Sequence, residues 1–350
     1  MNISAKITGI RYTPLLCRKL EIFPLKELTE ALKPRGNGTF ILQIDNKNQI
    51  AVSWWVSAKR SRSYPYGRVY DSLAFSGRKV TIIPIFKDEG QDGDKDFLQW
   101  DTVSLMSLLG VYVIIAYYKD AERSSKYRHK ITNQRFDIEY IENEIGKLLS
   151  YQSDALHWNL SQIDKIGEIG QKALKSYTRI AKKLGVEMHS RSSAEKRIAN
   201  LLKGRDEFMN LSRELAQSAQ QRESVTIQPK EKLAGTKALL TITNYLGGCY
   251  YFTADEVKIK GREVYLIEGK HSATNTLPSL EDIKDGLFKM ILFTNLEDVK
   301  IDRVNYMPKP VLKLTVKGGF RSNNLNESQR NNVDLLNKEA DTNGFGILLR

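Results

Sequence analysis

The sequence has few of the side chains on which several classes of protein depend. Only two cysteines, Cys17 and Cys249, occur in 350 residues, and they lie far apart. They are too few for a disulfide framework or a cysteine-ligated zinc site, and such sparse use of cysteine fits a reducing cytosol. The four histidines are scattered, so neither a histidine-metal nuclease nor a HEXXH hydrolase has support.

Several longer patterns are also absent. No run of 18 apolar residues and no signal-peptide pattern occurs, so we expect a soluble, unexported protein in the cytoplasm. The chain has neither a P-loop (GxxxxGK[ST]) nor the glycine-rich motif of methyltransferases. These absences argue against a motor-driven nuclease and against a bifunctional nuclease-methyltransferase.

Positive charge is in excess. The chain carries 54 Lys and Arg against 41 Asp and Glu, a formal net charge of +13. Such a balance favours a polyanionic partner such as nucleic acid. The length is sufficient for two domains, each with its own hydrophobic core.

The most informative stretch is residues 255–270, DEVKIKGREVYLIEGK. Two arms rich in β-branched residues flank Lys260-Gly261-Arg262, which predicts a β-hairpin. A turn at Gly261-Arg262 pairs Asp255 with Glu268, and paired residues have Cβ atoms about 5 Å apart. The second arm is apolar on both faces, as in a buried central strand, yet it ends in Glu268 and Lys270.

Two carboxylates and a lysine are therefore expected in one small site. Like charges destabilise each other there unless a cation lies between them, and hard divalent ions prefer carboxylate oxygens. The sequence thus predicts a metal site formed by Asp255 and Glu268. The alternative is a surface hairpin on which Glu268 and Lys270 are merely solvated.

An Asp entering a hairpin, followed by Glu-x-Lys on the next strand, resembles the active site of the PD-(D/E)xK nuclease superfamily. Ala254 replaces the Pro of the family motif, and the resemblance covers roughly residues 230–320. It implies Mg²⁺-dependent hydrolysis of DNA, with Asp255 and Glu268 as metal ligands. Lys270 would orient or activate the attacking water and stabilise charge on the phosphate. A Glu on the preceding helix often joins the metal site of this family, and Glu231 is available for that role.

Residues 1–120 predict an N-terminal α/β domain, with a helix at 24–33, strands at 40–45, 50–57, 80–86 and 111–118, and a helix at 97–109. Basic and aromatic side chains alternate in residues 59–70. Arginine binds phosphates and guanine edges, and tyrosine offers stacking surface. We therefore predict a DNA-facing loop, the alternative being an ordinary solvated loop. Its candidate contacts are Lys59, Arg60, Arg62, Tyr64, Tyr66 and Arg68.

A second acidic group follows at residues 88–101. Asp71 precedes the strand that ends in Lys87, and Asp101 on the next helix could supply the second carboxylate. Some members of the superfamily carry that acid on a helix. Asp71, Lys87 and Asp101 are therefore an alternative active site. Otherwise the acidic stretch caps a helix or is solvated.

The spacing of apolar residues divides the rest of the chain into three segments. Residues 121–223 predict a helical segment, because apolar side chains recur every three to four residues from Phe136. Residues 224–320 predict the nuclease core, with a helix at 230–246, a strand at 249–253, the hairpin, a helix at 280–293 and later strands. Lys289 on the last helix is either a phosphate contact or a solvated lysine. Residues 321–350 predict a polar C-terminal tail.

The sequence therefore predicts a mixed α/β protein with a restriction-endonuclease-like core. We expect a type II restriction enzyme that cuts double-stranded DNA with Mg²⁺ and leaves 5′-phosphates. A homodimer would suit a palindromic site, and a DNA methyltransferase would be the genetic partner. The alternatives are a repair or transposon-end nuclease of the same superfamily, or a catalytically idle DNA-binding protein.

Overall fold

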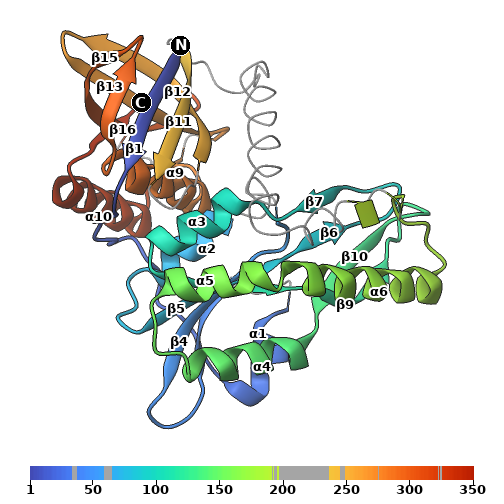
Figure 1. The fold of residues 1–350 in the computed structure, drawn as a ribbon. Coiled ribbons are helices and arrows are strands. Elements are labelled where there is room, and N and C mark those ends of the chain that lie inside the picture. Colours follow the sequence, from blue (N-terminus) through green and yellow to red (C-terminus); the bar gives the residue numbers. More distant parts are fainter. Residues whose placement is uncertain are drawn as a thin grey trace. The chain divides into compact units, whose positions relative to one another are not determined.

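The computed structural model describes residues 1–33, 38–58, 65–190, 192, 195–196, 236–244, 249–274, 276–321, 323 and 325–350. The chain is mixed α/β with several sheets, which confirms the predicted fold class at that level. It divides into two compact units: unit 1 is Met1–Arg18 with Glu214–Arg350, and unit 2 is Lys19–Arg213 (Figure 1). Among the described helices, none is both long enough and apolar enough to cross a membrane.

Unit 2 is built on a five-stranded mixed sheet. In spatial order its strands are β2 (Ile22–Pro24), β3 (Thr39–Gln43), β4 (Gln49–Trp54), β5 (Arg78–Pro84) and β8 (Val111–Ala116). β3 and β4 are antiparallel, whereas β4, β5 and β8 run parallel. The interior residues of β5 and β8 are almost all buried, which explains their continuous runs of Val and Ile.

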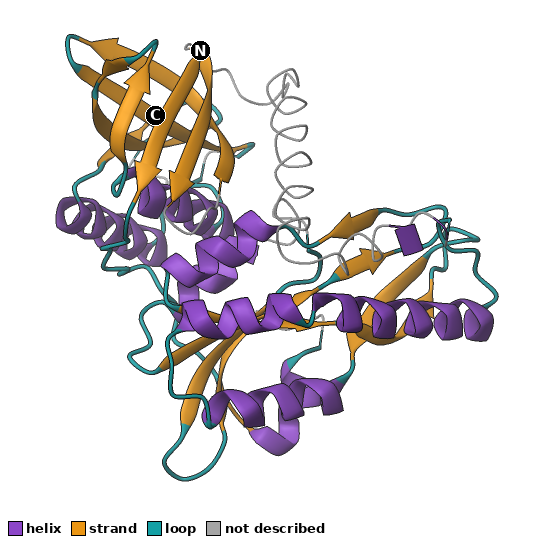
Figure 2. Ribbon diagram, viewed as in Figure 1, coloured by secondary structure: helices purple, strands orange, loops and turns teal. Residues whose placement is uncertain are grey.

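Helices surround this sheet. They are η1 (Leu25–Glu27), α1 (Leu28–Ala31), α2 (Pro65–Ser72), α3 (Trp100–Leu108), α4 (Ile138–Leu149), α5 (Ala155–Asp164) and α6 (Ile166–Leu184). α5 packs on β8, and α6 continues nearly in line with α5 (Figure 2). The predicted helical spacing of apolar residues is confirmed on α6, where Ala173, Tyr177 and Ile180 are buried. α6 ends at Gly185, whose φ of 61° suits the left-handed cap.

Two short antiparallel pairs complete unit 2. β6 (Phe86–Asp88) pairs with β7 (Lys95–Phe97), and β9 (Tyr118–Arg123) pairs with β10 (Ile131–Phe136). The predicted strand at 80–86 is therefore two strands separated at Ile85.

Unit 1 is built on an eight-stranded sheet. In spatial order its strands are β15 (Val304–Asn305), β14 (Glu297–Ile301), β1 (Asn2–Ile7), β11 (Thr236–Asn244), β12 (Cys249–Lys260), β13 (Glu263–Ser272), β16 (Met307–Val316) and β17 (Gly346–Leu349). β11, β12 and β13 form an antiparallel meander, and β16 then runs parallel to β13. Helix α9 (Leu280–Phe293), whose predicted bounds are confirmed, packs on β13 and β16. Helix α10 (Glu327–Asn343) precedes β17.

The division into units differs from the expected one at the N-terminus. Strand β1 pairs in parallel with β11 and antiparallel with β14, so residues 1–18 belong with the C-terminal half of the chain. Residues 19–120 and the helices α4 to α6 form one unit instead of two successive ones.

Two predicted elements of unit 1 are wrong. The helix expected at 230–246 is a strand over Thr236–Asn244, where Ala238, Leu240 and Ile242 are buried and their neighbours are not. That period of two belongs to a strand, although Ala and Leu favour helices. Residues 321–350 do not form a tail, because they contain α10 and β17. The buried face of α10 is narrow, which explains its polar sequence.

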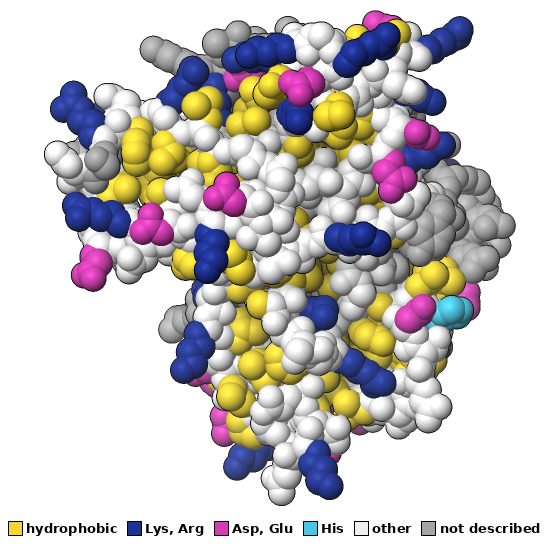
Figure 3. All heavy atoms as spheres, turned by 90° about the vertical axis from the view of Figure 1, so that its left-hand side faces the viewer, with side chains coloured by type: hydrophobic (Ala, Val, Ile, Leu, Met, Phe, Trp, Pro, Cys, Tyr) yellow, Lys and Arg dark blue, Asp and Glu magenta, His cyan; other side chains and the backbone are white. Residues whose placement is uncertain are grey.

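Lys and Arg side chains are scattered over the face of the molecule in Figure 3, with Asp and Glu side chains among them. The net charge of +13 is therefore not gathered into one basic patch on that face. A polyanion at this face would therefore meet dispersed positive charges and not one concentrated patch.

A buried carboxylate on α10 binds the N-terminal segment of unit 1, to which Asn343 of the same helix is also hydrogen-bonded at Thr13. Glu339 is fully buried and accepts hydrogen bonds from the Tyr12 hydroxyl at 2.7 Å, from Leu15 N at 2.8 Å and from Leu16 N at 2.9 Å. A buried carboxylate is stable when its oxygens receive several donors. Glu339 therefore joins the two ends of the chain within unit 1.

We expect Glu339→Gln to lower the free energy of unfolding by about 2 kcal/mol, because an amide group replaces one accepting oxygen and opposes an N–H donor. Urea denaturation followed by circular dichroism measures this change. Asp334→Asn, at an exposed position of the same helix, is the control and should leave the midpoint unchanged. Equal midpoints for both variants would show that Glu339 does not hold the segment.

Candidate active site

The predicted hairpin and its register are confirmed. Glu256 pairs with Ile267 and Lys260 with Glu263, as a two-residue turn at Gly261-Arg262 requires. Gly261 has a φ of 59°, a value that L-residues rarely adopt but a tight hairpin turn needs. This register brings Asp255 beside the end of β13 that carries Glu268 and Lys270.

A β-bulge lies next to the acidic residues. Ala254 pairs with Ala238, but Val257 pairs with Thr236, so Asp255 and Glu256 together oppose one residue of β11. A bulge turns side chains away from strict alternation and is frequent beside active sites. Sequence pattern alone gave no sign of it.

Asp255 joins the two strands of the hairpin. Its Oδ2 accepts a hydrogen bond of 2.8 Å from the backbone N–H of Gly269, the residue between Glu268 and Lys270. The side chain is half-buried, so the carboxylate lies between the interior of the sheet and its surface. Asp255 is thereby held beside the Glu-x-Lys segment.

Glu268 lies between two ammonium groups. It is 1% exposed, with Oε1 3.1 Å from Lys270 Nζ and Oε2 2.7 Å from Lys289 Nζ. Burial raises the pKa of Glu268 to about 7, and the nearby Asp255 charge adds to this rise, while both lysines oppose it. Burial alone would lower the pKa of either lysine, but the surrounding carboxylates raise both pKa values well above normal. Both lysines are therefore charged at neutral pH.

Helix α9 completes the site. Asp285 Oδ2 lies 2.7 Å from Lys270 Nζ, and Lys289 follows one helical turn later on the same face. Between them, Gly286 lets the helix approach β13 closely, because a Cβ there would lie 2.7 Å from Leu312 Cδ1 and 3.3 Å from Lys270 Cε. Asp285 and Gly286 were missed in the sequence. Their signal was an Asp and a Lys spaced by four residues on the buried face of α9.

The donor set suits a hard divalent cation. Mg²⁺ in proteins is usually bound by one or two carboxylates, with waters and substrate phosphates as its other ligands. Asp255 and Glu268 provide two carboxylates. Within the described ranges, no group of three or more His, Cys, Asp and Glu side chains could hold a metal ion. Glu231, predicted as a further ligand, lies outside the described residues.

The structure differs from the predicted DNA-facing loop. Lys59, Arg60, Arg62 and Tyr64 lie outside the described residues. The remainder is not a loop, because Pro65–Ser72 forms α2, with Pro at the first helical position as helices prefer. Lys289, also predicted as a DNA contact, lies against Glu268 inside the candidate site.

Tyr66 and Arg68 are used within unit 2. Tyr66 is 5% exposed and meets the Trp55 ring edge-on, with centroids 5.9 Å apart. Arg68 lies 4.6 Å above the Trp54 ring, and its Nη1 donates a 2.7 Å hydrogen bond to the Trp54 carbonyl. These side chains pack α2 against the end of β4 and against Trp55, the residue that follows it.

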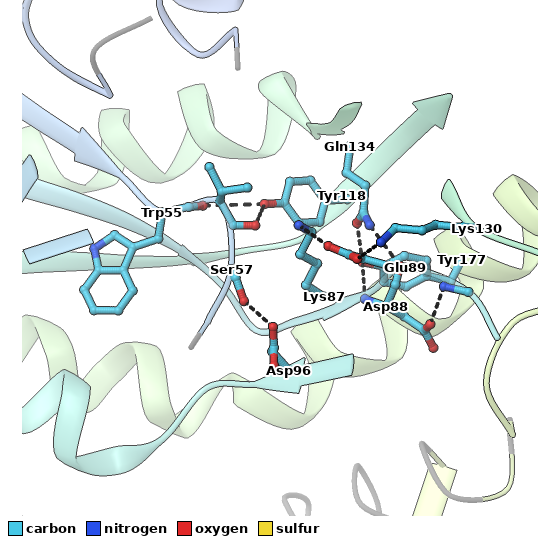
Figure 4. A network of polar contacts seen from close by, with 12 residues as sticks. Trp55, Ser57, Lys87, Asp88, Glu89, Asp96, Tyr118, Lys130, Gln134 and Tyr177 are labelled. Atoms are coloured by element: carbon cyan, nitrogen blue, oxygen red, sulfur yellow. Dashed lines mark hydrogen bonds and ion pairs between the residues drawn. The ribbon is translucent and has the colours of Figure 1, made fainter. Parts of the chain in front are cut away.

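The alternative group is arranged differently from the hairpin site. Asp71 on α2 and Asp101 on α3 are 2% and 3% exposed. Lys87 Nζ lies 2.7 Å from Glu89 Oε1, and Glu89 also faces Lys130 at 3.1 Å. Figure 4 shows this network, in which Lys87 and Lys130 converge on Glu89. Lys87 thus pairs with a carboxylate two residues along the chain.

Other acidic residues of the 88–101 stretch have protein partners as well. Asp96 accepts a 2.6 Å hydrogen bond from the Ser57 hydroxyl, and Asp88 Oδ1 lies 2.8 Å from His189 Nδ1 (Figure 4 shows Ser57 and Asp96). The Asp88 backbone is bound by Tyr177 and Gln134. The stretch is therefore an internal polar network, and the expectation of a solvated loop is wrong for these residues.

The Glu89 network predicts a dependence of stability on pH. Burial raises the pKa of Glu89, but Lys87 and Lys130 outweigh it and lower that pKa to about 2. A carboxyl group whose pKa is lowered by folding stabilises the fold at pH values above its pKa in the unfolded chain. That stabilisation is lost as the pH falls toward its pKa in the folded protein. Glu89→Gln should therefore lower the free energy of unfolding at pH 7 by about 2–3 kcal/mol.

The difference between wild type and Glu89→Gln should shrink as pH falls from 4.5 toward 2, which urea melts at successive pH values can follow. Glu139→Gln, whose side chain is 82% exposed, is the control and should behave as wild type. A Glu89→Gln difference that does not change with pH would contradict the lowered pKa.

Comparisons of the chain with protein-family models, with curated proteins and with solved structures find no match. The resemblance to the PD-(D/E)xK superfamily therefore depends on the hairpin motif and on the residues around it.

Proposed function

We propose that this protein is a site-specific endonuclease that hydrolyses phosphodiester bonds of double-stranded DNA at the β12–β13 hairpin, with Mg²⁺ as cofactor. The active site would comprise Asp255, Glu268 and Lys270. The closest functional class in this proposal is the type II restriction enzyme.

One observation carries the proposal: Glu268 is buried at 1% exposure between two lysines, with Asp255 beside them. Desolvating charged groups costs several kcal/mol per ion, and apolar residues of similar volume often stabilise a fold as well or better. Clustered buried charges with a strongly shifted pKa are typical of functional sites.

The order of elements supports the same function. The meander β11–β12–β13, then α9, then β16 parallel to β13 gives hairpin, helix and strand in the sequence that the family resemblance implies. The first element of that order departs from the resemblance, because β11 is a strand where a helix was expected.

In the proposed mechanism, Asp255 and Glu268 would hold Mg²⁺ with their carboxylates. When bound there, the ion would supply Lewis-acid activation of water and compensation of phosphate charge. The hydrogen bond from Gly269 N fixes Asp255 in position, and the two lysines compensate the charge of Glu268 in the metal-free protein. Water attacks in line with the departing 3′-oxygen, so the 5′-phosphate remains on the DNA.

Lys270 acts in this mechanism as a charged donor. Its pKa is raised by Glu268 and Asp285, so it stays protonated and is better suited to stabilise phosphate oxygens than to accept a proton. Asp285, 2.7 Å away, holds the ammonium in place. Of the two roles implied by the resemblance, charge stabilisation is thus favoured over activation of water.

A type II enzyme cutting a palindromic site would act as a two-fold homodimer, each copy cutting one strand. Its genetic partner would be a DNA methyltransferase of the same sequence specificity. The positive net charge would bring the protein to DNA, and binding should weaken steeply with salt.

Cleavage of plasmid and genomic DNA by the full chain tests the proposal. With Mg²⁺ we expect discrete fragments bearing 5′-phosphates, and with EDTA none. Glu268→Gln removes a metal ligand and Lys270→Met a charged donor, so each should reduce the cleavage rate about 100-fold or more. Gel electrophoresis of timed samples measures the rate.

Glu263→Gln is the matched control. Glu263 lies on the same strand, its side chain is 39% exposed, and it pairs with Lys309 away from the site. This variant should cut as wild type does. If Glu268→Gln and Lys270→Met both cut at the wild-type rate, the site lies elsewhere, and Asp71, Lys87 and Asp101 become the next candidates. DNA binding without cleavage would favour an idle DNA-binding protein.

A further inference from the structure

The two lysines that flank Glu268 differ in what else holds them. Lys270 has a second carboxylate, because Asp285 Oδ2 lies 2.7 Å from its Nζ and nearer than Glu268 Oε1 at 3.1 Å. Lys289 Nζ lies 2.7 Å from Glu268 Oε2, and its other hydrogen bond, 3.3 Å long, goes to the neutral carbonyl of Thr253. Asp285 would therefore hold Lys270 in place even without Glu268. The position of Lys289 depends on its ion pair with Glu268.

Lys289 also occupies the region that the proposed cation needs. Its charge interacts with both Glu268 and Asp255, the two carboxylates that would hold Mg²⁺. A cation bound to Glu268 at about 2.1 Å would lie close to an ammonium group that is 2.7 Å from the same carboxylate. Like charges this close repel strongly in a site with little water.

The side chain of Lys289 has a way to leave. It is 16% exposed, and the rotatable bonds of its four-carbon stem let the ammonium move away from Glu268. Loss of the Lys289 charge would be offset by the two charges of the cation. The exchange keeps the buried carboxylates compensated in both states.

We propose that Lys289 is a resident counter-ion of Glu268, which a divalent cation displaces when it binds. This inference rests on the proposed metal site. In the metal-free protein Lys289 compensates the buried carboxylate, and it thereby weakens metal binding by competition. Lys270, held by Asp285, stays in place throughout.

Titration calorimetry of Mg²⁺ and Mn²⁺ into the full chain at pH 8, without DNA, tests the competition. Lys289→Gln removes the competing charge, so its Kd for the metal should be lower than the wild-type Kd by about tenfold or more. Lys289→Arg keeps the charge and should bind as wild type. Lys309→Gln, which removes an exposed charge paired with Glu263, is the control for net charge and should also match wild type.

A Kd for Lys289→Gln equal to or higher than that of the wild type would overturn the inference. Even then, the proposed function would stand if the wild type binds metal and the Glu268→Gln variant does not. A wild type that binds neither metal would remove both.

A second measurement uses the unmodified sequence and does not depend on the folding of a variant. Reductive methylation followed by mass spectrometry reports the accessibility of each lysine. Mg²⁺ should increase the labelling rate of Lys289 severalfold and leave Lys313 unchanged, because Lys313 is paired with Glu256 at 2.8 Å and is 5% exposed. An unchanged rate for Lys289 at saturating Mg²⁺ would overturn the displacement.

Discussion

The Glu268 carboxylate lies in the layer between β13 and α9, and a charge at such a position requires opposite charges within hydrogen-bond distance. Much of the local structure meets that requirement. Helix α9 provides Lys289, which pairs with Glu268 directly, and Asp285, which holds Lys270 beside Glu268. Gly286 allows the helix to approach the sheet closely enough for these contacts. The hairpin motif is therefore half of the site, and the helix that follows it is the other half.

The hairpin could be predicted because its determinants are local. A glycine with positive φ at the turn and apolar residues on both arms fix the register within a few residues. The amphipathic pattern of α9 was equally informative about its bounds. Lys289 was predicted as either a phosphate contact or a solvated lysine, and neither interpretation anticipated its ion pair with Glu268.

The remainder depended on contacts between distant residues. β1 pairs in parallel with β11, which lies more than 200 residues later in the sequence, and such pairing leaves no local signal. The helix expected at 230–246 was wrong because Ala and Leu in β11 favour helices, whereas its tertiary neighbours require a strand. Asp285 was missed since its importance comes from Lys270, fifteen residues earlier.

The position of β1 inside the sheet of unit 1 bears on how this protein is made on the ribosome. β1 leaves the ribosome well before its neighbours β11 and β14. The roughly 230 residues between Ile7 and Thr236 take about 10–50 s to synthesise. A chain interrupted before β16 would lack the parallel neighbour of β13, and with it the support of Glu268 and Lys270. Assembly of this site therefore waits until β16 has been synthesised.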